Sequence, residues 1–523
     1  MASHVFQSPL RDVDIPLIPI TEFVLQKNAD IPDHPAIIDG HHGISYSFSE
    51  LAARIRKFAG GLQDNGFKAG DVLALIAANS PDYAVVFHGT ALCGGTVTTV
   101  NPSYGAAEIR QQLIDSNTVL IVSANACIPV VIDAMNGSSA RELITMETQE
   151  GYRSIEQLFG EEIEQVDVDL HTHPVVIPYS SGTTGLPKGV MLSHHNLVAN
   201  LVQTNSAVNY QPGESALAVL PFFHIYGMQV VMGSLLAAGV TVVTVPRFDM
   251  EQVLSLIQKY RITQFFAVPP IVLGLAKTPL LDQYDVSSLL KIFSGAAPLG
   301  AELAAQAQQR VGCPIVQGYG MTEISPVSHI TPELNSKPGS SGVTIANTES
   351  RIIDENGNDL GINEEGELLV RGPQVMIGYL NNITATQETI DKDGWLHTGD
   401  LARIDEDGYM TIVDRVKELI KYKGFQVAPA ELEALLITHP AIADVAVVGM
   451  PDEEAGELPK AFVTLKPGIE VADSGPDTIS AQAIKAFVAE HVASYKKIHT
   501  VEFIESIPKS ASGKILRRFL RDK

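Results

Sequence analysis

Cysteine is scarce in this sequence, and its scarcity excludes two kinds of protein. Only Cys93, Cys127 and Cys313 occur in 523 residues, far apart and without a CxxC pair. A disulfide-stabilised secreted fold and a structural zinc site both need more cysteines at closer spacing. The N-terminal residues also carry acids and prolines where a signal peptide has an apolar run. We therefore expect a cytoplasmic protein.

Basic residues are under-represented as well. Lysine and arginine together number 36 against 60 acidic residues, which gives a formal net charge of −24. This excess of negative charge argues against a general nucleic-acid binder or a protein of anionic membrane surfaces. An anionic substrate would have to be met by cations gathered in one place.

Uninterrupted apolar runs of membrane-spanning length are missing. Residues 216–246 carry no charge, but Pro221, His224 and several glycines interrupt them. The pattern predicts a strand, a turn, a helix and a second strand buried in a parallel sheet. We expect no membrane span.

Short β-rich runs alternate with helical patterns along the first 320 residues. This alternation predicts βαβ units and two parallel sheets covered by helices. The predicted strands are 72–78, 96–100, 119–124, 240–245, 262–268 and 289–295, and the predicted helices are 82–93, 107–115, 250–260 and 301–311.

The pattern changes after about residue 338. Short strands separated by Asn-Gly, Glu-Gly and Asp-Gly turns predict a small antiparallel subdomain. Helical and strand patterns resume after Asp414. The predicted fold class is α/β. Residues 1–414 would form a large N-terminal domain of two parallel α/β subdomains and a β subdomain, and residues 415–523 a small mobile C-terminal α/β domain.

A loop rich in glycine and hydroxyl residues, YSSGTTGLPKG, occupies residues 179–189. Its backbone N–H groups and hydroxyls suit a phosphate group. It fails the G-x-x-x-x-G-K-[ST] pattern, so a Walker-type NTPase is disfavoured. On composition alone, a plain connecting loop is the simpler interpretation. The candidate phosphate-binding residues are Ser180, Ser181, Gly182, Thr183, Thr184, Gly185 and Lys188.

Further polar motifs follow in the second half. Glu323, beside Thr322 in GYGMTE, has the carboxylate chemistry that Mg²⁺ prefers when phosphates supply its other ligands. Asp400 ends GWLHTGD on a predicted turn, where it can accept hydrogen bonds from a ribose diol. Basic residues cluster in DRVKELIKYKGFQ (414–426) and PKSASGKILRR (508–518). Taken singly, each has an ordinary structural explanation, such as a turn acid or a solvated helix face.

Taken together, the motifs resemble the adenylate-forming superfamily of acyl-CoA synthetases, beetle luciferases and peptide-synthetase adenylation domains. The resemblance runs from about residue 35 to the end. YSSGTTGLPKG, GYGMTE, GWLHTGD, DRVKELIKYKGFQVAPAELE and PKSASGKILRR occur in the family's order and spacing. PFFHIYG (221–227), SGAAPLG (294–300) and TEISPV (322–327) are most similar to the 4-coumarate–CoA ligases.

The resemblance implies an AMP-forming acid–thiol ligase that uses ATP, Mg²⁺ and coenzyme A. Thr322 would contact the α-phosphate, Glu323 would bind Mg²⁺, and Lys514 would bridge the substrate carboxylate and the α-phosphate. Asp400 and Arg415 would hold the ribose. The remaining nucleotide contacts would come from Gly295, Ala296, Ala297, Gln317, Gly318, Tyr319 (on the adenine), Gly320, Lys421 and Gln426.

The resemblance also implies a hinge and an acyl pocket. Lys417 would be the hinge residue for rotation of the small domain, and His224 and Lys421 would take part in catalysis. Tyr226 would donate a hydrogen bond to a phenolic substrate. Phe293 departs from plant 4-coumarate ligases, which often carry lysine just before this turn. The expected pocket residues are His224, Tyr226, Gly295, Gly320, Pro326 and Val327.

These residues favour an ATP-dependent carboxylate–CoA ligase for 4-coumarate or related hydroxycinnamates, as in phenylpropanoid metabolism. A medium- or long-chain fatty acyl-CoA synthetase resembling luciferase is the alternative, and a non-catalytic homologue is another. An amino-acid-activating module is disfavoured because PFFHIYG lacks the aspartate that would pair with an ammonium group. We expect small-molecule partners only, no nucleic acid, and a monomer or weak homodimer.

Overall fold

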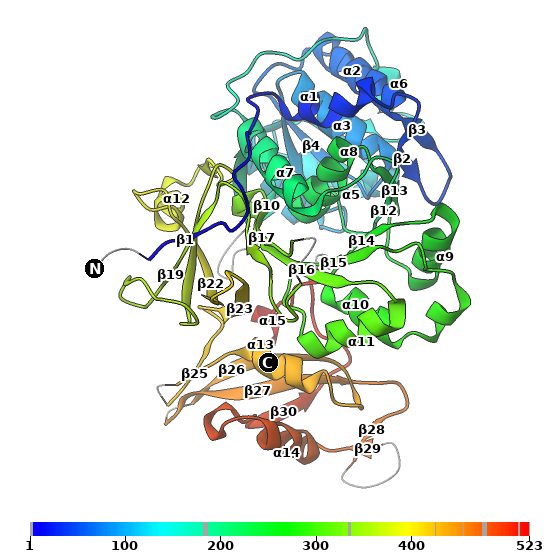
Figure 1. Cartoon of the computed structure of the whole chain (residues 1–523). Coiled ribbons are helices and arrows are strands. Elements are labelled where there is room, and N and C mark those ends of the chain that lie inside the picture. The colour runs from blue at the N-terminus through cyan, green and yellow to red at the C-terminus, as the bar shows by residue number, and fades with distance from the viewer. Residues whose placement is uncertain are drawn as a thin grey trace.

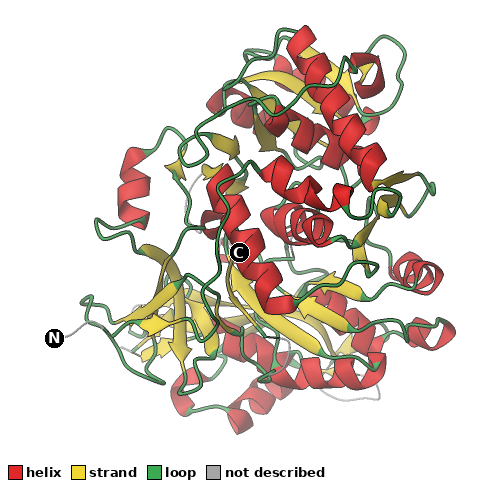
Figure 2. Cartoon of the chain, turned by 45° about the horizontal axis from the view of Figure 1, so that its top comes forward, coloured by secondary structure: helices red, strands yellow, loops and turns green. Residues whose placement is uncertain are grey.

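The computed structural model describes residues 4–180, 187–332, 336–423, 425–452, 454–472, 478–510 and 513–521. Figure 1 shows a large part and, below it, a smaller part built by the C-terminal residues. The large part contains two sheets rich in parallel strands and one antiparallel sheet, and the small part has a sheet and helices of its own. Figure 2 shows helices lying over the strands of the large part. The predicted α/β fold class is confirmed.

The first parallel sheet has the strand order β10-β11-β9-β5-β4-β6-β7-β8, with β21 beside β11. Alternate residues of β4 face opposite helical layers. Leu73 and Leu75 pack in the core cluster that includes α3, whereas Ala74 and Ile76 pack with α4 and α5. Because both faces are covered, the strand reads as a continuous apolar run. The elements are β4 (Val72–Ile76), β5 (Thr96–Thr99), β6 (Thr118–Ser123), β7 (Glu142–Thr145), β8 (Arg153–Ser154), β9 (Pro174–Val176), β10 (Tyr179–Ser180), β11 (Lys188–Ser193), β21 (Gly378–Tyr379), α3 (Pro81–Leu92), α4 (Ala106–Asp115) and α5 (Ile128–Met135).

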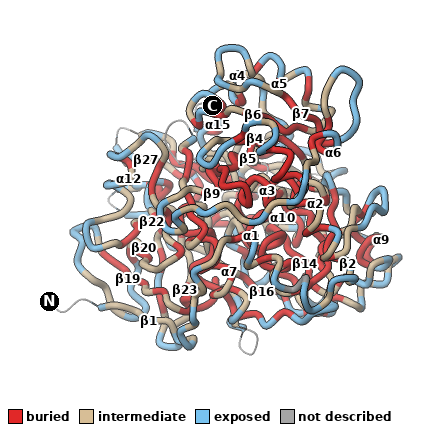
Figure 3. Tube along the Cα trace, turned by 90° about the horizontal axis from the view of Figure 1, so that it is seen from above, coloured by how far each residue is buried: buried red, intermediate tan, exposed pale blue. Residues whose placement is uncertain are grey.

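The second parallel sheet has the order β18-β17-β16-β15-β14-β12-β13-β2-β3 and is parallel from β16 to β2. The helices predicted at 250–260 and 301–311 are found with the same bounds, as α9 and α11. Figure 3 shows how buried residues concentrate inside the two layers. The elements are β2 (Pro35–Asp39), β3 (Ser45–Ser47), β12 (Ser215–Ala218), β13 (Thr241–Thr244), β14 (Gln264–Ala267), β15 (Lys291–Ser294), β16 (Ile315–Gly320), β17 (Val327–Ile330), β18 (Val343–Thr344), α1 (Ile20–Leu25), α2 (Phe48–Asp64), α7 (His194–Val208), α9 (Met250–Tyr260), α10 (Pro269–Lys277) and α11 (Ala301–Val311).

The uncharged segment 216–246 folds as predicted, into strand, turn, helix and strand. It begins within β12 and continues through a π-helix, η3 (Tyr226–Gly233), into α8 (Ser234–Ala238) and β13. The π-helical form of η3 was not predicted; such turns occur frequently at functional sites. In the part of the chain that the structure describes, no helix combines the length and apolarity that crossing a bilayer requires.

The antiparallel sheet after residue 338 has the order β1-β19-β20-β22-β23. Its first strand, β1 (Phe6–Gln7), comes from near the N-terminus and pairs with β19, which the sequence did not indicate. Its last strand ends at Arg415 and leads directly toward the small part. The remaining strands are β19 (Glu349–Ile353), β20 (Gly366–Arg371), β22 (Leu396–Ile404) and β23 (Met410–Arg415).

The small part is built on the strand order β25-β24-β27-β26, with β30 beside β27. Val445 and Val447 of β26 pack in the cluster that includes α13 and α14, and Ala446 and Val448 pack against Ile507 and Leu520 near the C-terminus. The elements are β24 (Ile420–Tyr422), β25 (Phe425–Val427), β26 (Ile442–Asp452), β27 (Gly456–Leu465), β30 (Thr500–Phe503), α13 (Pro429–Leu436), α14 (Ala481–His491) and α15 (Arg518–Arg521).

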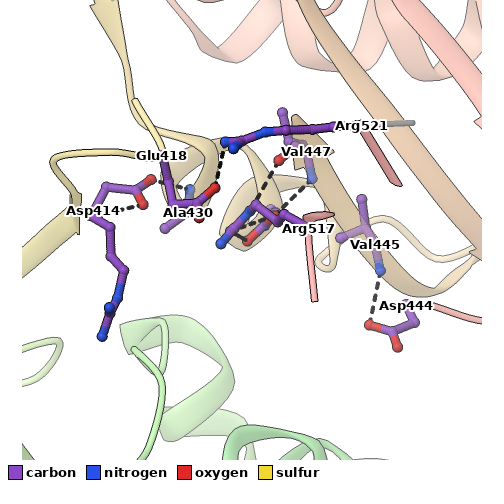
Figure 4. A network of polar contacts seen from close by, with 10 residues as sticks. Asp414, Glu418, Ala430, Asp444, Val445, Val447, Arg517 and Arg521 are labelled. Carbon is purple, nitrogen blue, oxygen red and sulfur yellow. Dashed lines mark hydrogen bonds and ion pairs between the residues drawn. The ribbon is translucent and has the colours of Figure 1, made fainter. Parts of the chain in front are cut away.

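Ion pairs fasten the C-terminal segment to this small part (Figure 4). Arg517 donates through Nη2 to both carboxylate oxygens of Glu433 on α13, at 2.8 and 2.7 Å. The side chains of this pair are only 14% and 13% exposed. Arg521 donates to Glu418 at 2.6 Å. Since a buried charge without a partner is costly, these contacts fix the path of the last described residues.

Removal of one partner of the Arg517–Glu433 pair should therefore cost more than replacement of both. We expect Arg517→Met to lower the free energy of unfolding by about 3–5 kcal/mol, because it leaves Glu433 buried and unpaired. The double variant Arg517→Met/Glu433→Gln should recover most of this loss. Urea denaturation followed by circular dichroism measures both.

The control is Arg310→Met, which breaks the ion pair between Arg310 and Asp282. Their side chains are 33% and 64% exposed. Exposed ion pairs contribute about 1 kcal/mol or less. If Arg517→Met and Arg310→Met lowered the free energy of unfolding equally, the buried pair would contribute no more to stability than the exposed one.

Candidate functional site

A cavity lies where parallel strands of the second sheet reach their carboxyl ends. The end of β14 and the segments that follow β15 and β16 meet there, as in the ligand-binding crevices of open α/β sheets. Lys514 of the small part closes it. The turn that carries Lys514 packs on the large part, since a Cβ added to Gly513 would lie 3.4 Å from Val268 Cγ2. The predicted site residues that line the cavity are His224, Tyr226, Gly295, Ala296, Gly318, Tyr319, Gly320, Thr322, Pro326, Val327 and Lys514.

Asp400, Arg415 and Tyr319 form a polar group next to this cavity. Asp400 and Arg415 are direct cross-strand partners of β22 and β23, and Arg415 Nε lies 3.1 Å from Asp400 Oδ1. Tyr319 donates its hydroxyl to Asp400 Oδ2 at 2.6 Å. The negative charge of Asp400 raises the pKa of Arg415. The structure thus brings together the three residues expected around adenine and ribose.

Thr322 and Glu323 lie in η5 (Thr322–Ile324), a short 3₁₀-helix that follows β16. Thr322 lines the cavity, and Glu323 is 4% exposed. Tyr379 of β21 donates its hydroxyl to Glu323 Oε1 at 2.9 Å. Sequence reasoning missed Tyr379, because nothing local in GYLNN indicates that β21 pairs with β11.

Lys514 and His224 share the cavity, and burial alters both. Loss of hydration lowers the pKa of the Lys514 ammonium; nearby Arg415 lowers it further, and Asp400 and Glu323 oppose the shift. Burial, with a smaller effect of Lys514, lowers the pKa of His224 to about 4. The backbone N–H of Tyr226 donates to His224 Nδ1 at 3.4 Å. At neutral pH His224 is therefore uncharged, with its proton on Nε2.

The far end of the cavity is mainly apolar. Phe293 stacks on Phe266, with ring centroids 5.3 Å apart and an interplanar angle of 10°. Tyr226 packs against Gly295, where an added Cβ would come within 2.8 Å of its ring. Its hydroxyl is 3.5 Å from the Phe293 carbonyl oxygen. This contact is at the limit of a hydrogen bond, so the hydroxyl is weakly held.

Other residues at this end were not singled out in the sequence. Thr204 and Tyr210 come from α7 and the turn after it, and Val230 comes from the π-helix. They reach the cavity through the packing of distant elements, so no local motif could have identified them.

Two predicted nucleotide contacts beside the cavity differ from the rest. The Gln317 side chain is used within the protein: its Oε1 accepts from Leu299 N at 2.8 Å and its Nε2 donates to Leu299 O at 3.1 Å. It therefore holds the 294–300 turn in place. Ala297 is half-buried in that turn but does not line the cavity.

Lys421 and Gln426 lie outside the cavity, as cross-strand partners in the exposed β24–β25 hairpin. Gln426 donates to Glu355 of the large part at 2.6 Å. In this arrangement of the two parts neither side chain reaches the cavity, so their contact with a nucleotide stays a prediction.

The phosphate-loop candidates are only partly described. Ser180 and Lys188 are cross-strand partners at the ends of β10 and β11. Ser181, Gly182, Thr183, Thr184 and Gly185 lie outside the described residues.

The connection between the two parts is short. β23 ends at Arg415 in the antiparallel sheet, and β24 begins at Ile420 in the sheet of the small part. Lys417 lies exposed in the turn between them, where Arg415 O accepts from the N–H groups of Glu418 and Leu419 at 2.9 and 3.2 Å. Asp414 Oδ2 accepts from Ala430 N at the start of α13, at 2.8 Å. The predicted hinge residue thus lies in the connection, while its role stays a prediction.

Comparisons with known proteins agree with this geometry. A model of the AMP-binding enzyme family matches residues 25–380, and one of the AMP-binding enzyme C-terminal domain matches residues 431–514. The 4-coumarate–CoA ligase of Pinus taeda is 43% identical, over 99% of this chain and 98% of its own length. The 4-coumarate–CoA ligase 2 of Oryza sativa subsp. japonica is 41% identical, over 100% of this chain and 95% of its own length.

Two solved structures have the same fold and more distant sequences. The anthranilate CoA ligase AuaEII in complex with anthranoyl-AMP superposes with a TM-score of 0.89 at 25% identity, over 97% of this chain and 98% of that one. ATP-bound MatB from Rhodopseudomonas palustris superposes with a TM-score of 0.88 at 27% identity, over 97% and 99%. The resemblance to adenylate-forming enzymes is confirmed, and this chain belongs to the AMP-binding enzyme family.

Proposed function

We propose that the protein is an ATP-dependent carboxylate–CoA ligase that acts through an acyl-adenylate on 4-coumarate or related hydroxycinnamates. One observation carries the chemistry: Lys514 enters a cavity whose other wall holds Thr322, beside the carboxylates of Asp400 and Glu323. The cation, the hydroxyl and the carboxylates are the groups that a nucleotide and a carboxylic acid need side by side.

The residues present fit MgATP. Within the described ranges, no cluster of three or more His, Cys, Asp or Glu side chains could hold a metal by itself. The single carboxylate of Glu323 suits Mg²⁺, which takes one or two protein carboxylates and completes its shell with phosphate oxygens and water. When bound, Mg²⁺ would neutralise charge on the phosphates. Asp400 would accept hydrogen bonds from the ribose, and Tyr319 would pack on the adenine.

In the first step, a carboxylate oxygen of the acid bonds to the α-phosphorus of ATP and the bond to pyrophosphate breaks. Negative charge crowds at the α-phosphate, so positioned cations and donors lower the barrier. Lys514 would bridge the acid and the α-phosphate, and Thr322 would donate to that phosphate. Neutral His224 can donate from Nε2 to the acid without adding charge.

In the second step, the thiolate of coenzyme A bonds to the acyl carbon and AMP leaves. Lys514 and the 513 turn occupy one side of the cavity in this structure. Rotation of the small part about Lys417 would remove them and bring the β24–β25 hairpin, with Lys421 and Gln426, toward the nucleotide. The short turn after Arg415, in which Val416 and Lys417 are exposed, supports this proposal.

The substrate class is supported by the relatives named 4-coumarate–CoA ligase and by the weakly held Tyr226 hydroxyl. The stacked Phe293 and Phe266 rings favour an apolar acyl group, so a fatty acid is the alternative. A pyrophosphate-release panel over hydroxycinnamic, cinnamic, benzoic and fatty acids tests the assignment. No release with any acid would favour a non-catalytic homologue. Cytoplasmic location and a monomer or weak homodimer stay predictions.

Lys514→Ala should separate the two half-reactions. Loss of the bridging cation should lower adenylate formation by about 10²–10³-fold. Thioester formation from a presynthesised adenylate should change far less, because the α-phosphate chemistry is then complete. Rapid-quench assays of each half-reaction measure this, and an equal fall in both would contradict the role of Lys514.

Lys417→Pro should leave adenylate formation largely intact and block transfer to coenzyme A. Proline fixes φ near −65° and removes an N–H, so the turn loses the backbone freedom that rotation requires. Single-turnover assays with and without coenzyme A measure the effect. Normal overall turnover would exclude rotation about this residue.

Tyr226→Phe should remove most of the preference for 4-coumarate over cinnamate and leave cinnamate turnover nearly unchanged. A hydroxyl that bonds a substrate hydroxyl contributes roughly 1–3 kcal/mol to such discrimination. The kcat/KM values for 4-coumarate, cinnamate and hexanoate in both proteins decide. If hexanoate is the best wild-type substrate, the fatty acyl-CoA assignment replaces the hydroxycinnamate one.

A further inference from the structure

Tyr379 connects two parts of the site that the sequence treats separately. It lies in β21, where it is the cross-strand partner of Val190 in β11. Leu380 N donates to Gly189 O at 2.8 Å. The strand that follows the phosphate loop is thereby attached to residues almost 200 positions later in the chain.

Its hydroxyl acts on Glu323. Tyr379 Oη donates to Glu323 Oε1 at 2.9 Å, in a position where both side chains are more than nine-tenths buried. Among the described residues, no hydrogen bond reaches the other oxygen, Oε2. A donor of this kind stabilises a buried carboxylate, fixes its rotation and leaves one oxygen for a cation.

Its ring acts on Lys188. The Lys188 ammonium nitrogen lies 4.7 Å from the centroid of the Tyr379 ring. A cation over an aromatic face is attracted by the electron density of the ring. One side chain therefore sets the position of both the lysine at the end of the phosphate loop and the carboxylate on η5.

The backbone around Tyr379 is itself firmly placed. Tyr379 N donates to Thr386 Oγ1 at 2.9 Å, and Thr386 in turn donates to Asn382 O at 2.9 Å. A Cβ added to Gly378 would come within 2.8 Å of Thr386 Cγ2. The backbone that carries the Tyr379 side chain is therefore held by this turn.

We propose that Tyr379 is a positioning residue for the Mg²⁺-bound phosphates of ATP. Its hydroxyl orients Glu323 toward the metal, and its ring keeps Lys188 beside the phosphates. The inference rests on the proposed function, since it assumes that MgATP binds here. This proposal predicts that the Tyr379 hydroxyl strengthens the binding of MgATP but not of metal-free ATP. The Tyr379 ring, in contrast, strengthens the binding of ATP even without metal.

The experiment measures ATP binding by isothermal titration calorimetry, with and without Mg²⁺ and in the absence of any acid. In Tyr379→Phe, MgATP affinity should fall roughly 10-fold, as is usual when the support of a metal ligand is removed. Metal-free ATP affinity should stay within about twofold, because the ring remains under Lys188. Turnover of this variant should recover at high Mg²⁺ concentration.

Tyr379→Leu removes the ring as well and should also weaken metal-free ATP binding. If Tyr379→Leu and Tyr379→Phe bind metal-free ATP equally well, the ring does not position Lys188. If Tyr379→Phe loses affinity for ATP equally with and without Mg²⁺, the hydroxyl stabilises the fold of the site and does not act through the metal. The proposal is then wrong.

Tyr46 offers a matched control. Its hydroxyl donates to Asp82 at 2.9 Å, and the Arg54 guanidinium lies 4.4 Å from its ring centroid, away from the cavity. Tyr46→Phe should lower the melting temperature by about as much as Tyr379→Phe does, because each loses one tyrosine–carboxylate hydrogen bond. Its affinity for MgATP should stay that of the wild type. If the wild type binds no ATP, the proposed function fails; if it forms an adenylate but Tyr379→Phe binds MgATP normally, only the role of Tyr379 fails.

Discussion

The placing of two cations, Arg415 and Lys514, out of water beside carboxylates is the constraint on which this site depends. The two cations come from different parts of the chain, and each is partly or largely removed from water. Burial lowers the pKa of Lys514 and nearby Arg415 lowers it further, whereas Asp400 and Glu323 oppose the shift. Two positive charges that are partly removed from water are tolerated only when carboxylates or bound phosphates offset them. A protein with a net charge of −24 thereby gathers two cations at one cavity.

Backbone packing leaves no room for a side chain at one point of the cavity wall. Gly320 and Pro326 both line the cavity, and a Cβ added to Gly320 would lie 2.1 Å from Pro326 O. At the far end, Tyr226, Phe266 and Phe293 line the cavity together with Thr204, Tyr210 and Val230. Substitutions at these positions can alter the shape of the far end while the end near Thr322 and Lys514 stays the same.

The sequence predicted elements with strong local signals best. Helix α9 begins where Asp249 accepts from Gln252 N, and α11 ends where Gly312 adopts a left-handed φ of 86°. Both signals are local, and both helices were predicted with correct bounds. Motif order likewise singled out Lys514 and Thr322, which line the same cavity, and Glu323 next to Thr322; their roles came from resemblance and stay predictions.

Contacts between distant segments could not be predicted in this way. The pairing of β1 with β19 and of β21 with β11 joins residues more than 180 positions apart. Tyr379, Tyr210 and Thr204 enter the site through such packing. Gln317 also shows a contact that the motif did not indicate: its side-chain amide bonds to the Leu299 backbone, while its contact with a nucleotide stays a prediction. The sequence pattern shows which residues are present and in what order. Only the tertiary structure shows which of them contact one another.

The two edges of the antiparallel sheet bear on the protein's tendency to aggregate. An unpaired edge strand is a template on which another chain can add a strand and start aggregation. Here β1 covers part of β19 on one side, and residues 341–342 exchange hydrogen bonds with Met410 at the start of β23 on the other. Residues near the N-terminus thus help to keep a sheet whose other strands lie more than 300 residues later from pairing with other molecules in a crowded solution.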